Sequence, residues 1–299
     1  MRTDRSCRVP FHCFILVLAL AGFLPARGAT TTVWVDDCTG TGAGTQGNPY
    51  CKIQTAICNI KTIGGTINVL PGTYLEAIRV PANITIISTD GPAVTTLNAT
   101  GKPCPAADFC ALGTQATCSA VYFGSVAGTT SRIEGIRITN TGGGIENATD
   151  STKIGAGIAV FDSSPTITRN EIVGNTIVSP TYRLFYGGGI YVNGSNHTVP
   201  CRPVITKNLV QGNVVDPPAG SITSQSLAVG GGIYIGFNAS AVITGNTIKA
   251  NRAGTVTTLN QFSNGAGVEI VSRVTVVETK VSGNLITGRH GTVWFEPLT

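Results

Sequence analysis

Short segments in which apolar and polar residues alternate recur along most of the chain. In the segments around Ile158 and Val160 and around Ile233 and Ile235, the apolar side chains would face one way in a strand of period two. Clusters of glycine and asparagine separate such segments. These residues are typical of sharp corners, where the backbone needs a positive φ or a side chain that hydrogen-bonds to its own turn. Helical spacing is nearly absent after residue 63. The pattern predicts many very short strands.

The strands belong to a repeating unit that contains two asparagines. The unit reads ITRNEIVGN from Ile167, ITKNLVQGN from Ile205 and ITGNTIKAN from Ile243, and a degenerate copy, VETKVSGN, begins at Val277. A glycine-rich strand precedes each copy. A unit of this size cannot bury its apolar face alone and must stack on its neighbours, so we expect a solenoid.

The repeated asparagines have a structural interpretation. Stacked rungs about 4.8 Å apart would bring equivalent asparagines into register, so that their amides bond along a ladder at a sharp turn. We expect these residues to hold the coil together rather than to bind a ligand. The two ladders comprise Asn170, Asn208, Asn246, Asn175, Asn213, Asn251 and Asn284.

The front of the chain carries a second signature, with WVDD from Trp34, NPYCKIQTAI from Asn48 and GGTINVLPGTYLEAIRV from Gly64. Together with the repeats, this succession resembles the right-handed parallel β-helix proteins of the pectin-lyase-like superfamily, and within it secreted proteins with short parallel β-helix repeats. The resemblance implies an all-β, right-handed, single-stranded parallel β-helix with a short N-terminal capping helix. It implies the fold more strongly than the activity, because the superfamily contains lyases, hydrolases, epimerases, tailspikes and non-catalytic surface proteins. The apolar face of the capping helix would comprise Ile53, Ala56, Ile57 and Ile60.

Three regions follow from these patterns. Residues 1–28 read as a signal peptide, because arginines precede an apolar run, Phe14–Leu24, that is too short to span a bilayer. Residues 29–63 are expected to form an N-terminal strand and the capping helix, and residues 64–299 the parallel β-helix, which ends without a clear C-terminal cap, as a truncated coil would. We therefore expect an exported protein, secreted or on the cell surface, with no transmembrane segment in the mature chain.

Composition narrows the class of partner. Charged residues make up only 12% of the chain and apolar residues 42%, which is typical of turns and small strands rather than of disorder. The formal charge is +5, but four arginines and one aspartate lie in the leader, so the mature chain carries about +2. This small charge predicts no nucleic-acid partner and no anionic membrane partner.

Seven of the nine cysteines follow the leader, and an oxidising compartment favours disulfides. Cys38 bonded to Cys51 would tie the first strand to the capping helix. Cys58 and Cys201 have no obvious partner, and no cysteine has metal-site spacing with a histidine, so we expect no metal. A further bond is expected between two of three cysteines: Cys104, Cys110 and Cys118.

Non-repeating segments at 176–186, 214–229 and 252–264 interrupt the repeat at the same point. We expect them to emerge as loops along one edge and to form one wall of a groove, which in the resembled superfamily flanks the sheet where polysaccharides lie. Tyrosines on the outward column of that sheet would stack on sugar rings, or would only cover the sheet by cross-strand packing. The column reads Tyr122, Ala159, Tyr191, Tyr234 and Glu269, of which the three tyrosines are the substrate-binding candidates.

Catalytic residues are less evident. A hydrolase needs two carboxylates about 5 to 9.5 Å apart. The candidates Asp162 and Glu269 lie about three rungs, or roughly 14 Å, apart, which argues against a pair, and Asp216 would have to swing toward Glu269 from its loop. A lyase needs a base and a cation that neutralises a uronate carboxylate. The cationic candidates are Arg169, Lys207 and Arg183.

Two functions follow. The first is a secreted or cell-surface β-helix that binds extracellular or cell-envelope polysaccharide or acts as a rigid surface module. The alternative is a polysaccharide lyase, glycoside hydrolase or epimerase acting on a uronate-containing polymer. No cofactor is expected, except calcium if the protein is a lyase.

Overall fold

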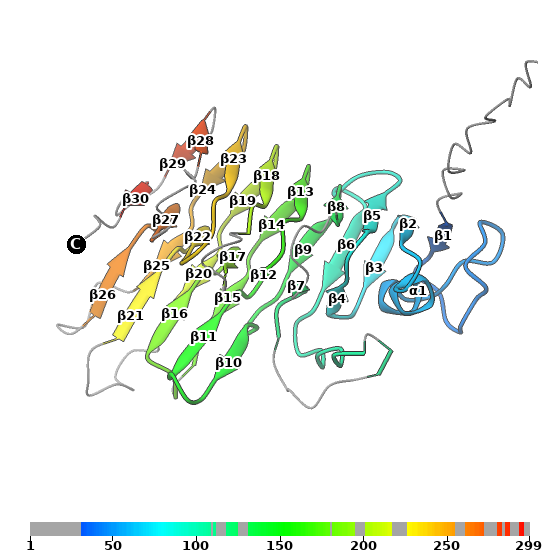
Figure 1. The fold of residues 1–299 in the computed structure, drawn as a ribbon, viewed down its shortest axis with the longest axis horizontal. Coiled ribbons are helices and arrows are strands. Elements are labelled where there is room, and N and C mark those ends of the chain that lie inside the picture. Colours follow the sequence, from blue (N-terminus) through cyan, green and yellow to red (C-terminus); the bar gives the residue numbers. More distant parts are fainter. Residues whose placement is uncertain are drawn as a thin grey trace, which may run out of the picture.

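The computed structural model describes residues 31–108, 110–111, 118–124, 131–179, 181–194, 201–216, 226–254, 261–271, 280–282, 285–287 and 293–295. These residues form a solenoid in which short strands of successive rungs lie side by side along the long axis (Figure 1). The strands belong to five sheets, here called sheets I to V in the order in which the chain visits them. The predicted class, an all-β parallel β-helix with a short N-terminal helix, is confirmed.

Sheets I and II form two walls of the coil. Sheet I contains, in spatial order, β1 (Thr32–Val35), β2 (Gly65–Val69), β5 (Ile84–Ser88), β8 (Arg132–Glu134), β13 (Thr166–Thr168), β18 (Val204–Thr206), β23 (Val242–Thr244) and β28 (Lys280–Ser282). Sheet II contains β3 (Gly72–Tyr74), β6 (Thr95–Asn98), β9 (Arg137–Thr139), β14 (Glu171–Val173), β19 (Leu209–Gln211), β24 (Thr247–Lys249) and β29 (Leu285–Thr287).

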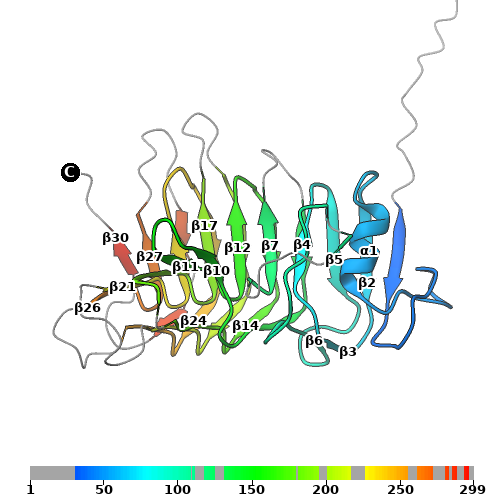
Figure 2. The ribbon, with the colours of Figure 1, turned by 90° about the horizontal axis from the view of Figure 1, so that it is seen from below.

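Sheet V closes the coil and is seen as a row of strands in Figure 2. It contains β4 (Ile78–Val80), β7 (Val121–Gly124), β12 (Ile158–Phe161), β17 (Ile190–Asn193), β22 (Ile233–Ile235), β27 (Val268–Ile270) and β30 (Val293–Phe295). Apolar side chains from these walls stack in columns inside the coil, where the residues are fully buried. One column of sheet I includes Ile86, Ile133, Ile167, Ile205 and Ile243.

The segments expected to be loops form two further sheets, which corrects the prediction of a loop wall. Sheet III contains β15 (Thr176–Ile177), β20 (Val214–Val215) and β25 (Arg252–Ala253). Sheet IV contains β10 (Ile145–Asn147), β11 (Thr152–Ile154), β16 (Leu184–Tyr186), β21 (Ser226–Val229) and β26 (Gln261–Asn264), in which β10 and β11 are antiparallel. The two sheets share a small core of their own, formed by Ala156, Ile177, Phe185, Val215 and Ala228.

The asparagine ladders are present at the corners of the coil. The Nδ2 atom of Asn208 donates to Asn246 Oδ1 at 2.9 Å and to the Ile167 carbonyl at 2.9 Å, while Asn208 Oδ1 accepts from the amide N–H and the side chain of Asn170. Asn175, Asn213 and Asn251 repeat this pattern at the second corner. Asn284, the expected last member of that ladder, lies outside the described residues.

The capping helix α1 (Ile53–Ile60) covers the N-terminal end of the coil. Its buried face consists of Ile53, Ala56, Ile57 and Ile60, as the spacing predicts. A disulfide joins Cys38 to Cys51 just before the helix, again as predicted. Because a terminal rung would otherwise expose core side chains, this helix seals the hydrophobic interior.

Candidate functional site

The outward column of sheet V has the predicted register. Tyr122 lies opposite Ala159, Ala159 opposite Tyr191, Tyr191 opposite Tyr234, and Tyr234 opposite Glu269. The expected exposure is wrong for the central tyrosines, because Tyr191 is only 7% exposed and Tyr234 only 5%. They pack with side chains of sheet IV, which the sequence presented as loops.

The faces of these rings are occupied by other side chains. The guanidinium of Arg79 lies 4.5 Å from the centroid of the Tyr122 ring, and Phe161 stacks on Tyr122 with centroids 5.7 Å apart. Tyr191 and Tyr234 stack on each other at 5.3 Å with nearly parallel planes. The aromatic row therefore covers the sheet by cross-strand packing, the simpler of its two interpretations, and offers no open platform at Tyr191 and Tyr234.

The three candidate carboxylates do not form an exposed pair. Glu269 is fully buried, so a polymer cannot reach it. Asp216 forms an ion pair with Arg252 at 2.8 Å, so it is held in place rather than turned toward Glu269. Asp162 is half-buried at the end of sheet V and has a positive φ of 47°.

The candidate cations lie at different corners. Arg169 is exposed and pairs with Glu134, in the turn between sheets I and II. Lys207 occupies the equivalent turn of the next rung, with a similar positive φ. Arg183 is exposed just before β16, at the other side of the coil. Arg169 and Lys207 thus share an exposed turn conformation, as expected for a column of solvent-exposed side chains along the coil.

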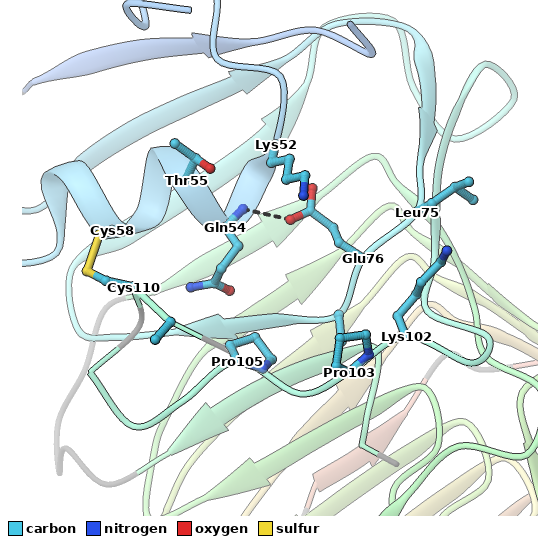
Figure 3. Close-up of a pocket in the computed structure, with 12 residues that line it drawn as sticks. Lys52, Gln54, Thr55, Cys58, Leu75, Glu76, Lys102, Pro103, Pro105 and Cys110 are labelled. Carbon is cyan, nitrogen blue, oxygen red and sulfur yellow. Dashed lines mark hydrogen bonds between the residues drawn. A yellow bond between two sulfur atoms is a disulfide. The ribbon is translucent and has the colours of Figure 1, made fainter. Parts of the chain in front are cut away.

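A pocket of about 500 Å³ lies between α1 and the segment that follows β6 (Figure 3). The sequence did not indicate it, because its walls come from parts of the chain that carry no repeat. Lys52 and Lys102 lie on its rim although they are 50 residues apart in the chain. The remaining lining residues are Gln54, Thr55, Cys58, Leu75, Glu76, Ala77, Pro103, Pro105, Cys110 and Ala111.

A disulfide between Cys58 and Cys110 holds the outer wall of this pocket against α1. Lys61 supports the same contact by donating to the Asp108 carbonyl and, at 3.1 Å, to the Cys110 sulfur. Cys110 was one of three expected partners, but its bond to Cys58 was not predicted. Pairing depends on the fold of a loop outside the repeat, so spacing in the sequence did not reveal it.

Glu76 lines the pocket and caps the N-terminus of α1. Its carboxylate accepts the backbone N–H groups of Ile53 at 2.7 Å and Gln54 at 3.0 Å, a favourable position at a helix N-terminus. Burial raises the pKa of Glu76 above its ordinary value, while the two N–H groups and the charge of Lys52 act in the opposite direction. Its carboxylate is thus engaged with the helix, and the lysines supply the positive charge of the rim.

A second pocket, of about 190 Å³, adjoins the first and shares Pro105 with it. Gln54 of the first pocket bonds Arg79 of the second, since its Oε1 accepts from the Arg79 amide at 2.7 Å and its Nε2 donates to the Arg79 carbonyl at 3.4 Å. The other lining residues are Ile78, Arg79, Cys104, Cys118, Ser119, Tyr122 and Ile145. Within the described part of the chain, no group of three potential metal ligands is present.

No family model matches this chain, and no curated protein sequence matches it. Among solved structures, pectin methylesterase from carrot aligns with a TM-score of 0.39 and 14% identity over 88% of each chain. Rice weevil pectin methyl esterase gives 0.38 and 13% over 83% of this chain and 86% of that one, and PemA from Erwinia chrysanthemi gives 0.33 and 12% over 86% and 94%. No residue role is transferred at these values.

The fold assignment rests on the strand pairing of the chain itself. Five sheets of short strands, repeated in register from rung to rung, define a parallel β-helix. None of the described helices is long and apolar enough to cross a membrane. The expected signal peptide lies outside the described residues.

Proposed function

We propose that this protein is an exported β-helix that binds acidic polysaccharide of the extracellular space or cell envelope. The pocket between α1 and the segment after β6 would hold one uronate-type sugar unit of the polymer. The observation that carries the proposal is that Lys52 and Lys102 both line one concave pocket, whose wall is fixed by the Cys58–Cys110 bond.

The chemistry of the lining suits a charged sugar. A volume of about 500 Å³ lies within the range of sites for small ligands. Leu75 is 57% exposed and, with Pro103 and Pro105, offers apolar surface to the C–H face of a sugar ring. The lysines carry charge for a carboxylate, and Thr55 brings a hydroxyl for a ring substituent.

The burial and ion pairing of two candidate carboxylates support binding rather than catalysis. Glu269 is buried and Asp216 is ion-paired, so neither stands ready beside an exposed groove. A catalytic site would gather several titratable groups around one bond. Catalysis as a lyase, hydrolase or epimerase is therefore the second candidate function. It can be tested with the same purified protein.

Binding would be measured calorimetrically with the exported protein and oligogalacturonate, at low and at physiological salt. We expect the Lys52→Ala/Lys102→Ala variant to bind roughly tenfold more weakly, because two charges at a concave site are lost. Lys207→Ala/Lys249→Ala removes the same charge from the outside of the coil and is the matched control. Equal weakening in both variants, or none in either, would contradict the proposed site.

Catalysis would be tested by incubating the protein with acidic and neutral polysaccharides, with and without calcium. Mass spectrometry would follow unsaturated products and new reducing ends. We expect neither. Unsaturated products would instead establish a lyase, and saturated fragments a hydrolase.

A further inference from the structure

Three cysteines remain as thiols in the described part of the chain, and two of them lie together. Cys104 and Cys118 are buried, form a hydrogen bond with each other and line the same 190 Å³ pocket. Cys118 also points its sulfur toward the Lys102 carbonyl at 3.8 Å. Cys201 lies elsewhere, just before β18, where its backbone bridges to Ala239.

The two thiols mark the ends of one loop. Cys104 follows β6 and Cys118 precedes β7, so a bond between them would close the connection from sheet II to sheet V. Cys110 lies between them and is already bonded to Cys58 on α1. The connection from sheet II to sheet V also supplies Pro103, Pro105 and Ala111 to the wall of the larger pocket.

We propose that Cys104 and Cys118 form a third disulfide in the exported protein and lock this loop onto the N-terminal end of the coil. Each thiol loses its proton, one S–S bond forms, and the two electrons reduce the disulfide of a thiol–disulfide oxidoreductase in the export compartment to two thiols. The step requires no glycan and does not depend on the proposed binding function.

The environments of the thiols agree with this chemistry. The hydrogen bond from Cys118 lowers the pKa of Cys104, whereas the same bond and burial raise the pKa of Cys118. Since the thiolate is the attacking species, Cys104 is the nucleophile of the pair. Burial raises the pKa of Cys201 to about 12, which leaves little thiolate there for exchange.

Differential labelling of the protein recovered from its export route tests the bond. Thiols are blocked with iodoacetamide in denaturant without reductant, then disulfides are reduced and labelled with N-ethylmaleimide, and the peptides are mapped. We expect maleimide on Cys104 and Cys118 and the acetamide label on Cys201. Acetamide label on both Cys104 and Cys118 would overturn the proposal.

Variants establish the partner in each bond. Cys104→Ser should leave Cys118 labelled as a free thiol, and Cys201→Ser, the control, should leave the other labels unchanged. In Cys58→Ser/Cys110→Ser, Cys104 and Cys118 should stay oxidised; their appearance as thiols there would show a different pairing and overturn the proposal. The labelling pattern of the parent protein tests the proposal even if a variant fails to fold. That pattern does not depend on whether the protein binds a glycan.

Discussion

At the residue scale, the buried asparagines are the side chains that make the most hydrogen bonds between rungs of the coil. An amide can donate and accept at once, so each asparagine joins three rungs. Asn208 bonds Asn246 on one side and accepts from Asn170 on the other, while it also satisfies the Ile167 carbonyl. Such a chain requires an amide at every step, which explains the spacing of 38 residues between members.

Replacing Asn208 by alanine should destabilise the protein by about 3 kcal/mol, because it leaves a buried N–H and a buried carbonyl unsatisfied. The measurement is the free energy of unfolding in urea. Asn68→Ala, on the outer face of β2, is the matched control and should stay within about 0.5 kcal/mol of the parent. An equal effect at both positions would mean that the ladder bonds contribute no more than a surface amide.

Arg169 serves the fold at its turn, where it pairs with Glu134 together with Arg132. Burial opposes ionisation of Glu134, but the two guanidinium groups outweigh it and lower its pKa below the ordinary 4.5. A carboxylate with a lowered folded-state pKa adds stability above its unfolded-state pKa. That stability is lost as the pH falls through the lower folded-state value.

Arg169→Gln should therefore flatten the pH dependence of stability below pH 4.5, because Glu134 then ionises less readily in the folded state. Urea midpoints at neutral and acidic pH would show a smaller difference than in the parent. The loss at neutral pH should be under about 1 kcal/mol, as for an exposed pair. Lys207→Gln, at the equivalent turn, should keep the parent's pH profile; an unchanged profile in Arg169→Gln would refute the role of this pair.

At the element scale, strands of two to five residues are stable only because they stack. The corner before β12, β17 and β22 is tight, which explains the glycines there. A Cβ on Gly232 would lie 2.5 Å from the carbonyl oxygen of Gly267 in the next rung. Gly189 meets Gly232 in the same way, so these glycines form a column in which an added Cβ would meet the next rung.

Gly232→Ala should cost about 1–3 kcal/mol, since a rigid backbone atom of the next rung must move. Thermal and urea unfolding would both report it. Gly47→Ala, where an added Cβ meets nothing within 4 Å, is the control and should be nearly neutral. A neutral Gly232→Ala would show that the rungs separate easily, against the tight stacking described here.

At the scale of the whole molecule, the non-repeating segments decide which surfaces are open. Sheet IV covers Tyr191 and Tyr234, which a repeat-based interpretation left exposed. At the other end, α1 seals the coil, and the loop bonded to it by Cys110 creates the pocket with Lys52 and Lys102. The sequence therefore suggested a binding site in the middle of sheet V, whereas the candidate pocket in the structure lies at the N-terminal end of the coil.

The amino-acid sequence by itself determined the parallel coil, the asparagine ladders, the apolar face of α1 and the Cys38–Cys51 bond. These features are periodic or close in the chain, so their spacing in the sequence is their spacing in the fold. Only the tertiary structure decided that Tyr191 and Tyr234 are buried, that Cys58 bonds Cys110, and that two lysines share a pocket. These outcomes depend on contacts with segments outside the repeat. Such segments lie far apart in the chain, and no local sequence pattern predicts that they come into contact.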